Sequence, residues 1–146
     1  MKRLILAMAA CLAVGTAQAA ELNWLTSLPD AQAKAKAEDK LVLMEFTGSD
    51  WCPPCKMLHK EVMTSKEFAE YAKDNLVLVE LDFPKKKEQT AELKKANQDL
   101  AEKYKITGYP TVIVLDSSGK EVYRAVGYSG AKAKEYVATL EKEVGH

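Results

Sequence analysis

Two cysteines separated by two residues are the part of this sequence best suited to chemistry. Cys52 and Cys55 enclose Pro53 and Pro54, and the segment that follows has helical periodicity. If Cys52 caps that helix, the two prolines fill its first two positions, where a missing N–H removes no intrahelical hydrogen bond. The nearest amide for the Cys52 sulfur is then that of Cys55. A thiolate is the nucleophile of thiol–disulfide exchange, and a helix start stabilises it. The spacing therefore predicts a redox pair, with Cys52 attacking and Cys55 resolving the mixed disulfide.

Metal binding is the main chemical alternative for the same cysteines. A structural zinc site would need two more Cys or His ligands, and beyond the pair the chain offers only Cys11, His59 and His146. This ligand count disfavours zinc. A soft ion such as Cu(I) stays open, because His59 follows Cys55 by one helical turn. A purely structural disulfide is disfavoured, since so short a loop restricts the unfolded chain little.

The first 19 residues have the pattern of a secretory signal. Lys2 and Arg3 precede a short apolar run from Leu4 to Val14, and small residues lead to a cleavage site after Ala19. The run is too short to span a bilayer, and no later segment is long and apolar enough to do so. We therefore predict a soluble domain over residues 20–146 in the periplasm or outside the cell, without stable membrane insertion.

Cys11 offers a second interpretation of this N-terminus. Small residues Ala9 and Ala10 precede it, as they would in a lipid-anchored protein, but Met8 stands where a bacterial lipoprotein signal usually has Leu. The secretory signal is favoured. Disulfides persist outside the cytosol, so export favours a cysteine pair that acts on the disulfides of other proteins.

The remaining chain alternates between helical and extended patterns. Over the whole sequence, the 21 basic and 21 acidic side chains balance, and this balance gives no support to nucleic-acid binding. Residues 22–28 suit a short strand or an anchored arm. Apolar, β-branched or alternating runs predict strands over 41–47, 76–83, 111–115 and 120–126, the last two joined by a hairpin turn. Helical spacing and caps predict helices over 29–39, after Cys52, and over 66–74, 85–105 and 131–143.

Helical spacing also predicts which side chains face the core. The expected inward residues are Met57, Leu58 and Val62 after the cysteines, then Phe68 and Tyr71, then Leu93, Ala96, Leu100 and Tyr104, and finally Tyr136, Val137 and Leu140. The lysines at 85–87 are expected on a solvated face. This order of elements predicts an α/β domain with a central sheet between helices and an antiparallel edge.

The motif WCPPCK at 51–56, followed by GYPT at 108–111, resembles the thioredoxin family, and the likeness extends from Leu41 to Val144. More narrowly, TGSDWCPPCK with a following TSKEF is similar to exported bacterial thioredoxin-like domains. The resemblance implies a thioredoxin fold: a central mixed sheet flanked by helices, with a C-terminal β-hairpin and helix. It also implies disulfide oxidoreductase activity without a dissociable cofactor or metal.

Specific roles follow from the resemblance, position by position. Cys52 matches the exposed attacking cysteine and Cys55 the buried resolving one. Trp51 matches the tryptophan that flanks the active site. Pro110 matches a cis-proline that faces the disulfide and positions the backbone of the substrate, with Thr111 beside it.

Two positions near the motifs depart from the family pattern. Glu45 stands where the family has a buried aspartate. Burial would raise its pKa and suit it to relay a proton to Cys55, whereas a side chain pointing to solvent would have no such role. Tyr109 is bulkier than the residue usual before the cis-proline, so it either reshapes the substrate surface or simply packs.

The Pro-Pro spacer bears on the direction of the reaction. It lacks the His of strongly oxidising relatives, which removes one source of thiolate stabilisation and should make the disulfide less oxidising. We therefore favour an enzyme that reduces or transfers disulfides in client proteins carrying disulfides or thiols. The resemblance further implies a membrane electron donor of the Dsb reductive type, and we expect a monomer. The alternatives are a disulfide-donating oxidant and a copper-binding module that uses Cys52, Cys55 and His59.

Overall fold

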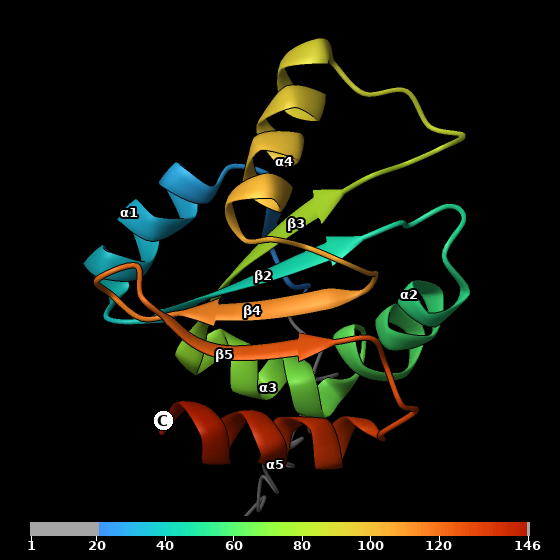
Figure 1. The fold of residues 1–146 in the computed structure, drawn as a ribbon. Helices are drawn as coiled ribbons and strands as arrows, with labels where there is room; N and C mark the ends of the chain where they lie inside the picture. The colour runs from blue at the N-terminus through green and yellow to red at the C-terminus, as the bar shows by residue number, and fades with distance from the viewer. Residues whose placement is uncertain (1–20, 146) are drawn as a thin grey trace, which may run out of the picture.

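A five-stranded mixed sheet forms the centre of the molecule (Figure 1). The structure is a computed structural model that describes residues 21–145, so the predicted signal segment and Cys11 lie outside the described residues. The strands are β1 (Trp24–Leu25), β2 (Leu41–Thr47), β3 (Leu76–Asp82), β4 (Thr111–Leu115) and β5 (Glu121–Val126). Their order in the sheet is β1-β3-β2-β4-β5, with β1, β3 and β2 parallel and β4 and β5 antiparallel to their neighbours.

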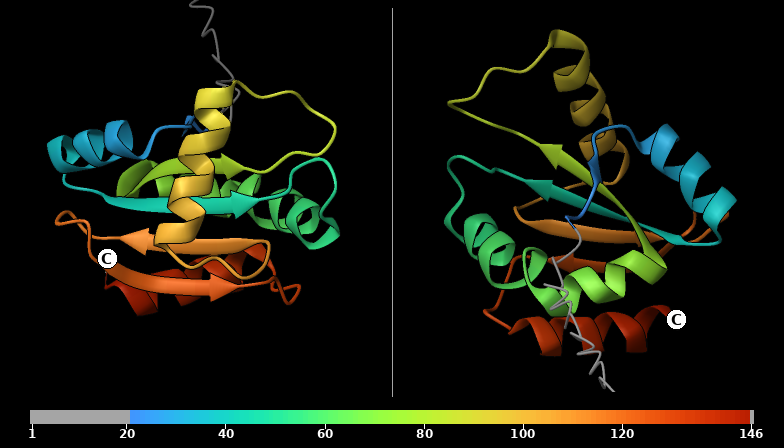
Figure 2. Two further views of the ribbon diagram at one scale, coloured as in Figure 1. Left: turned by 45° about the horizontal axis from the view of Figure 1, so that its top comes forward. Right: turned by 180° about the vertical axis from the view of Figure 1, so that it is seen from behind.

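Helices cover both faces of this sheet (Figure 2). One face carries α1 (Leu28–Glu38) and α4 (Ala91–Lys103). The other carries α2 (Pro53–Leu58), the π-helical turn η1 (His59–Met63), α3 (Lys66–Asn75) and α5 (Ala133–Val144). This is the predicted thioredoxin fold, including the C-terminal hairpin and helix, and that prediction is confirmed.

Strand β2 is buried along its whole length and divides the core in two. Because side chains alternate across a strand, Leu41 and Leu43 pack in the layer of α3 and α5, whereas Val42, Met44 and Phe46 pack in the layer of α1 and α4. Glu45 has the parity of Leu41 and Leu43. Its side chain therefore belongs to the same layer as α2.

Side-chain caps set where three helices begin. Ser27 Oγ accepts the Asp30 amide at 3.4 Å, Ser65 Oγ accepts the Phe68 amide at 3.1 Å, and Thr90 Oγ1 accepts the Leu93 amide at 3.2 Å. Each cap satisfies an amide that has no intrahelical partner. The Ser65 cap begins the helix that was predicted over 66–74.

The predicted helix over 85–105 is correct only from Ala91 onward. Residues 85–90 form a loop instead, because the Asp50 carboxylate binds the backbone amides of residues 85–87. On α4 itself, Ala96 is exposed and Asn97 is buried, contrary to the predicted inward face. The Asn97 Nδ2 donates to the Asp82 carbonyl at 3.0 Å, so a hydrogen bond stabilises a polar residue in a position that periodicity assigned to alanine.

Met57 is a second correction, since 51% of its surface is exposed. The chain widens into η1 directly after α2, and this wider turn brings Leu58, Val62 and Met63 into the core while Met57 stays outside. The predicted inward positions of Leu58 and Val62 are confirmed.

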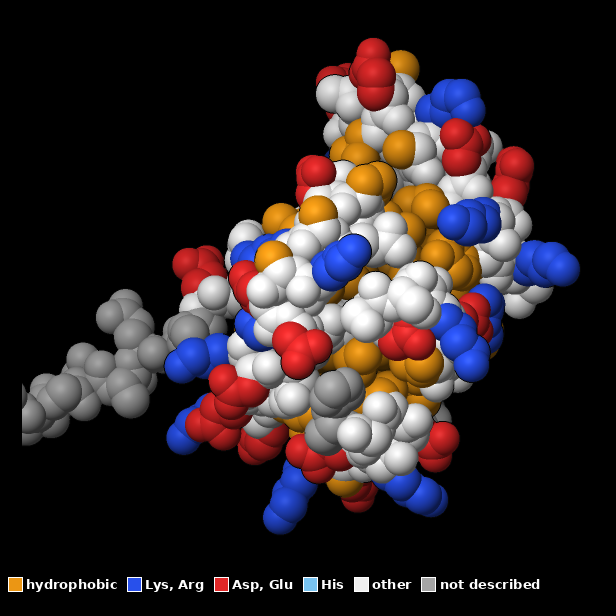
Figure 3. Space-filling view, turned by 90° about the vertical axis from the view of Figure 1, so that its left-hand side faces the viewer, with side chains coloured by type: hydrophobic (Ala, Val, Ile, Leu, Met, Phe, Trp, Pro, Cys, Tyr) orange, Lys and Arg blue, Asp and Glu red, His pale blue; other side chains and the backbone are white. Residues whose placement is uncertain are grey.

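The end of the molecule opposite α2 carries charges of both signs. Figure 3 shows Lys and Arg side chains interspersed with Asp and Glu over this face. Across residues 21–145, no helix combines the length and the apolar character needed to cross a bilayer.

Candidate active site

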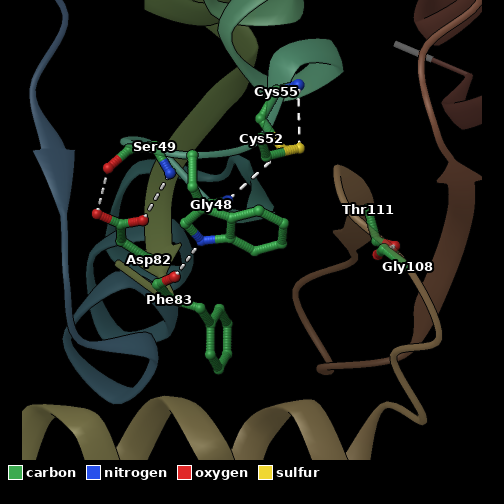
Figure 4. The surroundings of a disulfide bond; sticks show 9 residues. Gly48, Ser49, Cys52, Cys55, Asp82, Phe83, Gly108 and Thr111 are labelled. Carbon is green, nitrogen blue, oxygen red and sulfur yellow. Dashed lines mark hydrogen bonds between the residues drawn. A yellow bond between two sulfur atoms is a disulfide. The ribbon is translucent and has the colours of Figure 1, made fainter. Parts of the chain in front are cut away.

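The two cysteines lie at the start of α2, just after the turn that connects β2 to this helix. The chain turns after Gly48, whose carbonyl accepts the amides of Trp51 at 3.2 Å and Cys52 at 2.9 Å. Cys52 is the N-cap of α2, with Pro53 and Pro54 in the first two helical positions as predicted. Its Sγ accepts the Cys55 amide at 3.4 Å and is bonded to Cys55 in a disulfide (Figure 4).

Both sulfurs are covered by protein. Cys52 is 3% exposed and Cys55 is 1% exposed, so the exposed position implied for Cys52 is wrong for the disulfide form. The reason is that the Cys52 sulfur folds back onto the first turn of α2, where it meets both Cys55 and the Cys55 amide. The Cys55 Sγ in turn accepts the Gly48 amide at 3.5 Å.

The segment before β4 contains the expected cis-proline. The Tyr109–Pro110 bond is cis, and the Pro110 carbonyl accepts the Gly127 amide at 2.7 Å, which ties the segment to the end of β5. Thr111 is fully buried, and its hydroxyl donates to the Gly108 carbonyl at 2.7 Å (Figure 4). The Thr111 side chain therefore points into the protein, and the role of Thr111 in substrate binding stays a prediction. Pro110 is buried as well.

Three aromatic side chains, Trp51, Phe83 and Tyr109, form a cluster that we call the aromatic ledge. The Trp51 Nε1 donates to the Phe83 carbonyl at 2.7 Å. The Tyr109 ring lies 5.9 Å from the Trp51 ring, edge to face at 80°, and 5.3 Å from the Phe83 ring. All three are partly exposed, so Tyr109 both packs and contributes to the surface.

Two neighbours hold the Trp51 indole in place. A Cβ atom at Gly48 would overlap the indole, lying 2.7 Å from its Cζ2 and Nε1 atoms, so only glycine leaves room for the ring. The Lys85 ammonium lies 3.9 Å from the Trp51 ring centroid, in cation–π contact.

Asp50 holds the loop that carries this lysine. Its two carboxylate oxygens accept the backbone amides of Lys85, Lys86 and Lys87 at 3.0, 2.7 and 2.9 Å. These hydrogen bonds, that of Lys85 above all, favour the ionised form and lower the pKa of Asp50 to about 2. The loop is thereby connected to the turn that presents Trp51.

Glu45 lies on the opposite side of the disulfide from the aromatic ledge, in the α2 layer. It is 2% exposed, which excludes the alternative of a side chain pointing to solvent. It lines a cavity of about 320 Å³ together with Thr47, Ser49, Cys55, Lys56, His59, Glu80 and Lys87. Burial, with smaller contributions from Glu80 and Asp82, raises the pKa of Glu45 to about 8.

Comparison with known proteins agrees with this geometry. Residues 28–143 match the thioredoxin-like domain family. The chain belongs to the thioredoxin-like family. It is 36% identical over 123 residues to disulfide bond reductase DsbH of Chlamydia pneumoniae, covering 84% of this chain and 73% of DsbH. It is 33% identical over 119 residues to thioredoxin-related protein DsbJ of the same organism, covering 77% of this chain but 34% of DsbJ.

A solved structure of the DsbH oxidoreductase superimposes on this thioredoxin-like chain with a TM-score of 0.81. The two are 30% identical, and the match covers 99% of this chain and 95% of the other. Together with the Cys52–Cys55 disulfide, these likenesses show that the protein is a thiol–disulfide oxidoreductase.

Sequence reasoning missed the importance of Asp82, which anchors the turn before the cysteines. Its Oδ1 accepts the Ser49 amide at 3.0 Å and its Oδ2 accepts the Ser49 hydroxyl at 2.5 Å (Figure 4). The Lys87 ammonium lies 3.0 Å from the same Oδ2. The sequence did contain a signal, because Asp82 is an acidic residue at the end of a mostly apolar run that predicts a strand. The carboxyl ends of parallel strands in such sheets often carry functional groups.

Glu80 was also missed, because it interrupts the apolar run of β3 without matching a motif.

His59, the candidate third copper ligand, is exposed at the wall of the cavity. In the part of the chain that the structure describes, no three His, Cys, Asp or Glu side chains are grouped as a metal site would require.

Proposed function

We propose that this thioredoxin-like protein reduces or transfers disulfides in client proteins, with Cys52 as the nucleophile and Cys55 as the resolving thiol. The observation that carries this direction is the cap of α2. A cap side chain ordinarily accepts the amide at the second or third helical position. Pro54 removes the first of these donors and leaves the Cys55 amide, which bonds the Cys52 sulfur.

Sparse stabilisation of the thiolate favours a reducing pair. A dithiol enzyme becomes a strong oxidant when its reduced form is stabilised, above all through a low thiol pKa. In this protein the spacer contributes neither an imidazole nor a second amide. The disulfide form is therefore relatively stable, and the dithiol form gives up its electrons readily.

The reaction begins from the reduced pair and ends in the disulfide seen in the structure. The Cys52 thiolate attacks one sulfur of a client disulfide, which forms a mixed disulfide and releases the first client thiolate. Cys55 then passes its proton to the Glu45 carboxylate, and the resulting thiolate attacks the Cys52 sulfur. The Cys52–Cys55 bond forms, the second client thiolate leaves, and both client sulfurs take up protons from solvent.

The client is expected to approach across the aromatic ledge. Trp51 and Tyr109 are the partly exposed members of the predicted substrate set, whereas Pro110 and Thr111 are buried. Aromatic surface binds a polypeptide segment at low conformational cost.

We further propose that the protein works in the periplasm or outside the cell and is reduced there by a membrane electron donor. The signal pattern over residues 1–19 supports export. An oxidising compartment does not regenerate the dithiol by itself, so each catalytic cycle requires electrons delivered across the membrane.

Insulin reduction with dithiothreitol as electron source tests this function. The wild-type protein should accelerate insulin precipitation, and Cys52→Ser should abolish the acceleration. Cys55→Ser should instead accumulate a covalent client adduct at Cys52, visible by mass spectrometry, because the resolving thiol is missing. Equal adduct formation by Cys52→Ser, or no acceleration by the wild type, would overturn the proposal.

A further inference from the structure

Two glutamates stand side by side in the sheet behind the disulfide. Glu45 on β2 and Glu80 on β3 are direct partners in the parallel register of these strands. Side chains at paired positions of adjacent strands lie on the same face, with their backbones about 5 Å apart. Glu80 therefore projects, like Glu45, into the layer that contains α2 and Cys55.

Both glutamates line one cavity with the resolving cysteine. The cavity of about 320 Å³ includes Cys55 and Glu45 in its buried wall. Three of its lining residues, Lys56, His59 and Lys87, are exposed, so the cavity reaches the protein surface. A polar cavity of this size has ample room for water molecules that carry a proton.

Burial differs along this cavity. Glu45 is 2% exposed, and its Oε1 has no hydrogen-bond partner among the residues that the structure describes. Glu80 is only partly buried, so it meets a smaller desolvation penalty and ionises more easily than Glu45. The two carboxyl groups thus form a graded series from the buried sulfur toward solvent.

Other charges around the pair come from several elements. Burial, and then the charge of Asp82 on β3, raise the pKa of Glu80 above its ordinary value, and Lys87 and His59 offset part of that rise. The Lys87 ammonium, from the loop after β3, lies 3.0 Å from the Asp82 carboxylate. Tyr136 on α5 is partly buried, and its buried hydroxyl has no hydrogen-bond partner among residues 21–145. Lys56 on α2 completes the set of groups that line the cavity. The basic side chains lie toward solvent, on the side of Glu80, so Glu80 loses its proton more easily than Glu45.

We propose that Glu80 shares the proton that Glu45 takes from Cys55 and passes it to solvent through the cavity, acting as a positioning residue for Glu45. This inference rests on the proposed function, because it concerns the resolving step. Cys55–SH and the Glu45 carboxylate become a Cys55 thiolate and a protonated Glu45. The proton then moves through water to the Glu80 carboxylate and on to solvent, which restores both carboxylates while the thiolate forms the Cys52–Cys55 bond.

Sharing a proton makes the two carboxyl groups titrate as a coupled pair. Each group then responds to the ionisation of the other, and its titration curve shows two steps. In a Glu80→Gln variant the like charge is absent, so Glu45 should titrate as a single step at lower pH, by roughly one pH unit. A glutamate that only fills space on β3 would leave the titration of Glu45 unmoved.

Carboxyl-carbon NMR of the oxidised full chain tests this inference without interference from the cysteine thiols. The wild-type Glu45 and Glu80 signals should each show both steps, and Glu80→Gln should move the Glu45 midpoint downward from about 8. Glu102→Gln, which removes an exposed carboxylate on α4 across the sheet, should not move it. Independent single-step curves in the wild type, or an unmoved midpoint in Glu80→Gln, would overturn the inference.

A kinetic measurement separates this inference from the proposed function. The rate of mixed-disulfide resolution, followed against pH, should show the same downward shift of its midpoint in Glu80→Gln and a plateau lowered several-fold. If the wild type fails to reduce insulin, the proposed function fails. If it reduces insulin and the resolution profile of Glu80→Gln overlays that of the wild type, only the role of Glu80 is wrong.

Discussion

The two sides of the disulfide differ in the kind of group that they present. Toward α2, α3 and α5, Cys55 meets a cavity that is also lined by Glu45, Glu80 and the exposed basic side chains. On the other side, toward α1 and α4, lies the aromatic ledge with the cation of Lys85 above Trp51. We propose that proton transfer takes place on the first side and client binding on the second.

This division follows from the alternation of side chains along β2. Glu45 and Phe46 are consecutive, yet Glu45 faces the cavity and Phe46 packs in the opposite layer. There the centroid of the Phe46 ring lies 6.2 Å from that of the Tyr104 ring. The disulfide lies at the carboxyl end of this strand, where both layers reach it. Acid–base chemistry and client binding can therefore be altered separately by substitution on one side or the other.

The largest effect is expected on the polar side, from Glu45→Gln. Without a base beside Cys55, resolution of the mixed disulfide should slow about 100-fold at and above about pH 8, where the wild-type Glu45 is ionised and can accept the proton, in the range that general-base catalysis contributes. Initial attack by Cys52 should change little, because Cys52 is activated by the Cys55 amide. Stopped-flow measurement of the two phases separates these steps. Equal slowing of both phases would contradict a division of labour between the two sides.

The same substitution should also change how stability depends on pH. The pKa of Glu45 is about 8 in the folded protein and about 4.3 in an unfolded chain, so the folded state holds the proton between these values. Wild-type stability therefore falls as pH rises through this window, by up to about 1.4 kcal/mol per pH unit. Urea unfolding of Glu45→Gln should show a flatter dependence, with the two proteins running parallel below about pH 4. A wild-type curve that is flat from about pH 5 to pH 8 would show that Glu45 is not buried as described.

On the aromatic side, Gly48→Ala should displace the Trp51 indole. The added Cβ overlaps the ring and should weaken the bond from Nε1 to the Phe83 carbonyl, at a cost of about 1–3 kcal/mol in the free energy of unfolding. We expect the KM for a client to rise several-fold with the resolution rate preserved. Gly108→Ala is the matched control, since its Cβ would make only an ordinary contact with Val126 at 3.8 Å. Identical kinetics in both variants would remove the ledge from client binding.

The smallest effect is expected from Asp50→Ala, which releases the loop at 85–87. The amides of Lys85, Lys86 and Lys87 lose their acceptor and should exchange with solvent faster, while the amides of β2 and β3 keep their protection. In the wild type the lowered pKa of Asp50 keeps the loop attached until the pH falls to about 2. Asp74→Asn, an exposed change on α3, should leave the exchange of these amides unaltered.

Local sequence signals predicted the elements that local forces determine. The bounds of β2 were predicted correctly, because an apolar run with a following Gly-Ser-Asp turn specifies both its burial and its end. The cysteine cap was also predictable, since two prolines can begin a helix but not continue one. The start of α4 was not, because residues 85–90 contain helix formers whose amides bind a carboxylate 35 residues away in the chain.

Carboxylates on the polar side were harder to predict than the cysteines. Glu80 and Asp82 lie within what reads as a buried apolar strand, and their roles depend on the register with β2 and on the turn at Ser49. Both are long-range features of the sheet. The motif located the disulfide, whereas the sheet topology determines which acids surround it.

The most direct test of the central claim is the equilibrium reduction potential of the Cys52–Cys55 pair. Glutathione or dithiothreitol buffers can set the reduction potential of the solution. Trp51 fluorescence should report the conversion of the disulfide to the dithiol, because its ring lies beside the disulfide. We predict a value near that of thioredoxin, about −270 mV, in keeping with a disulfide-reducing enzyme. A value near about −120 mV would contradict this account and identify a disulfide-donating oxidant.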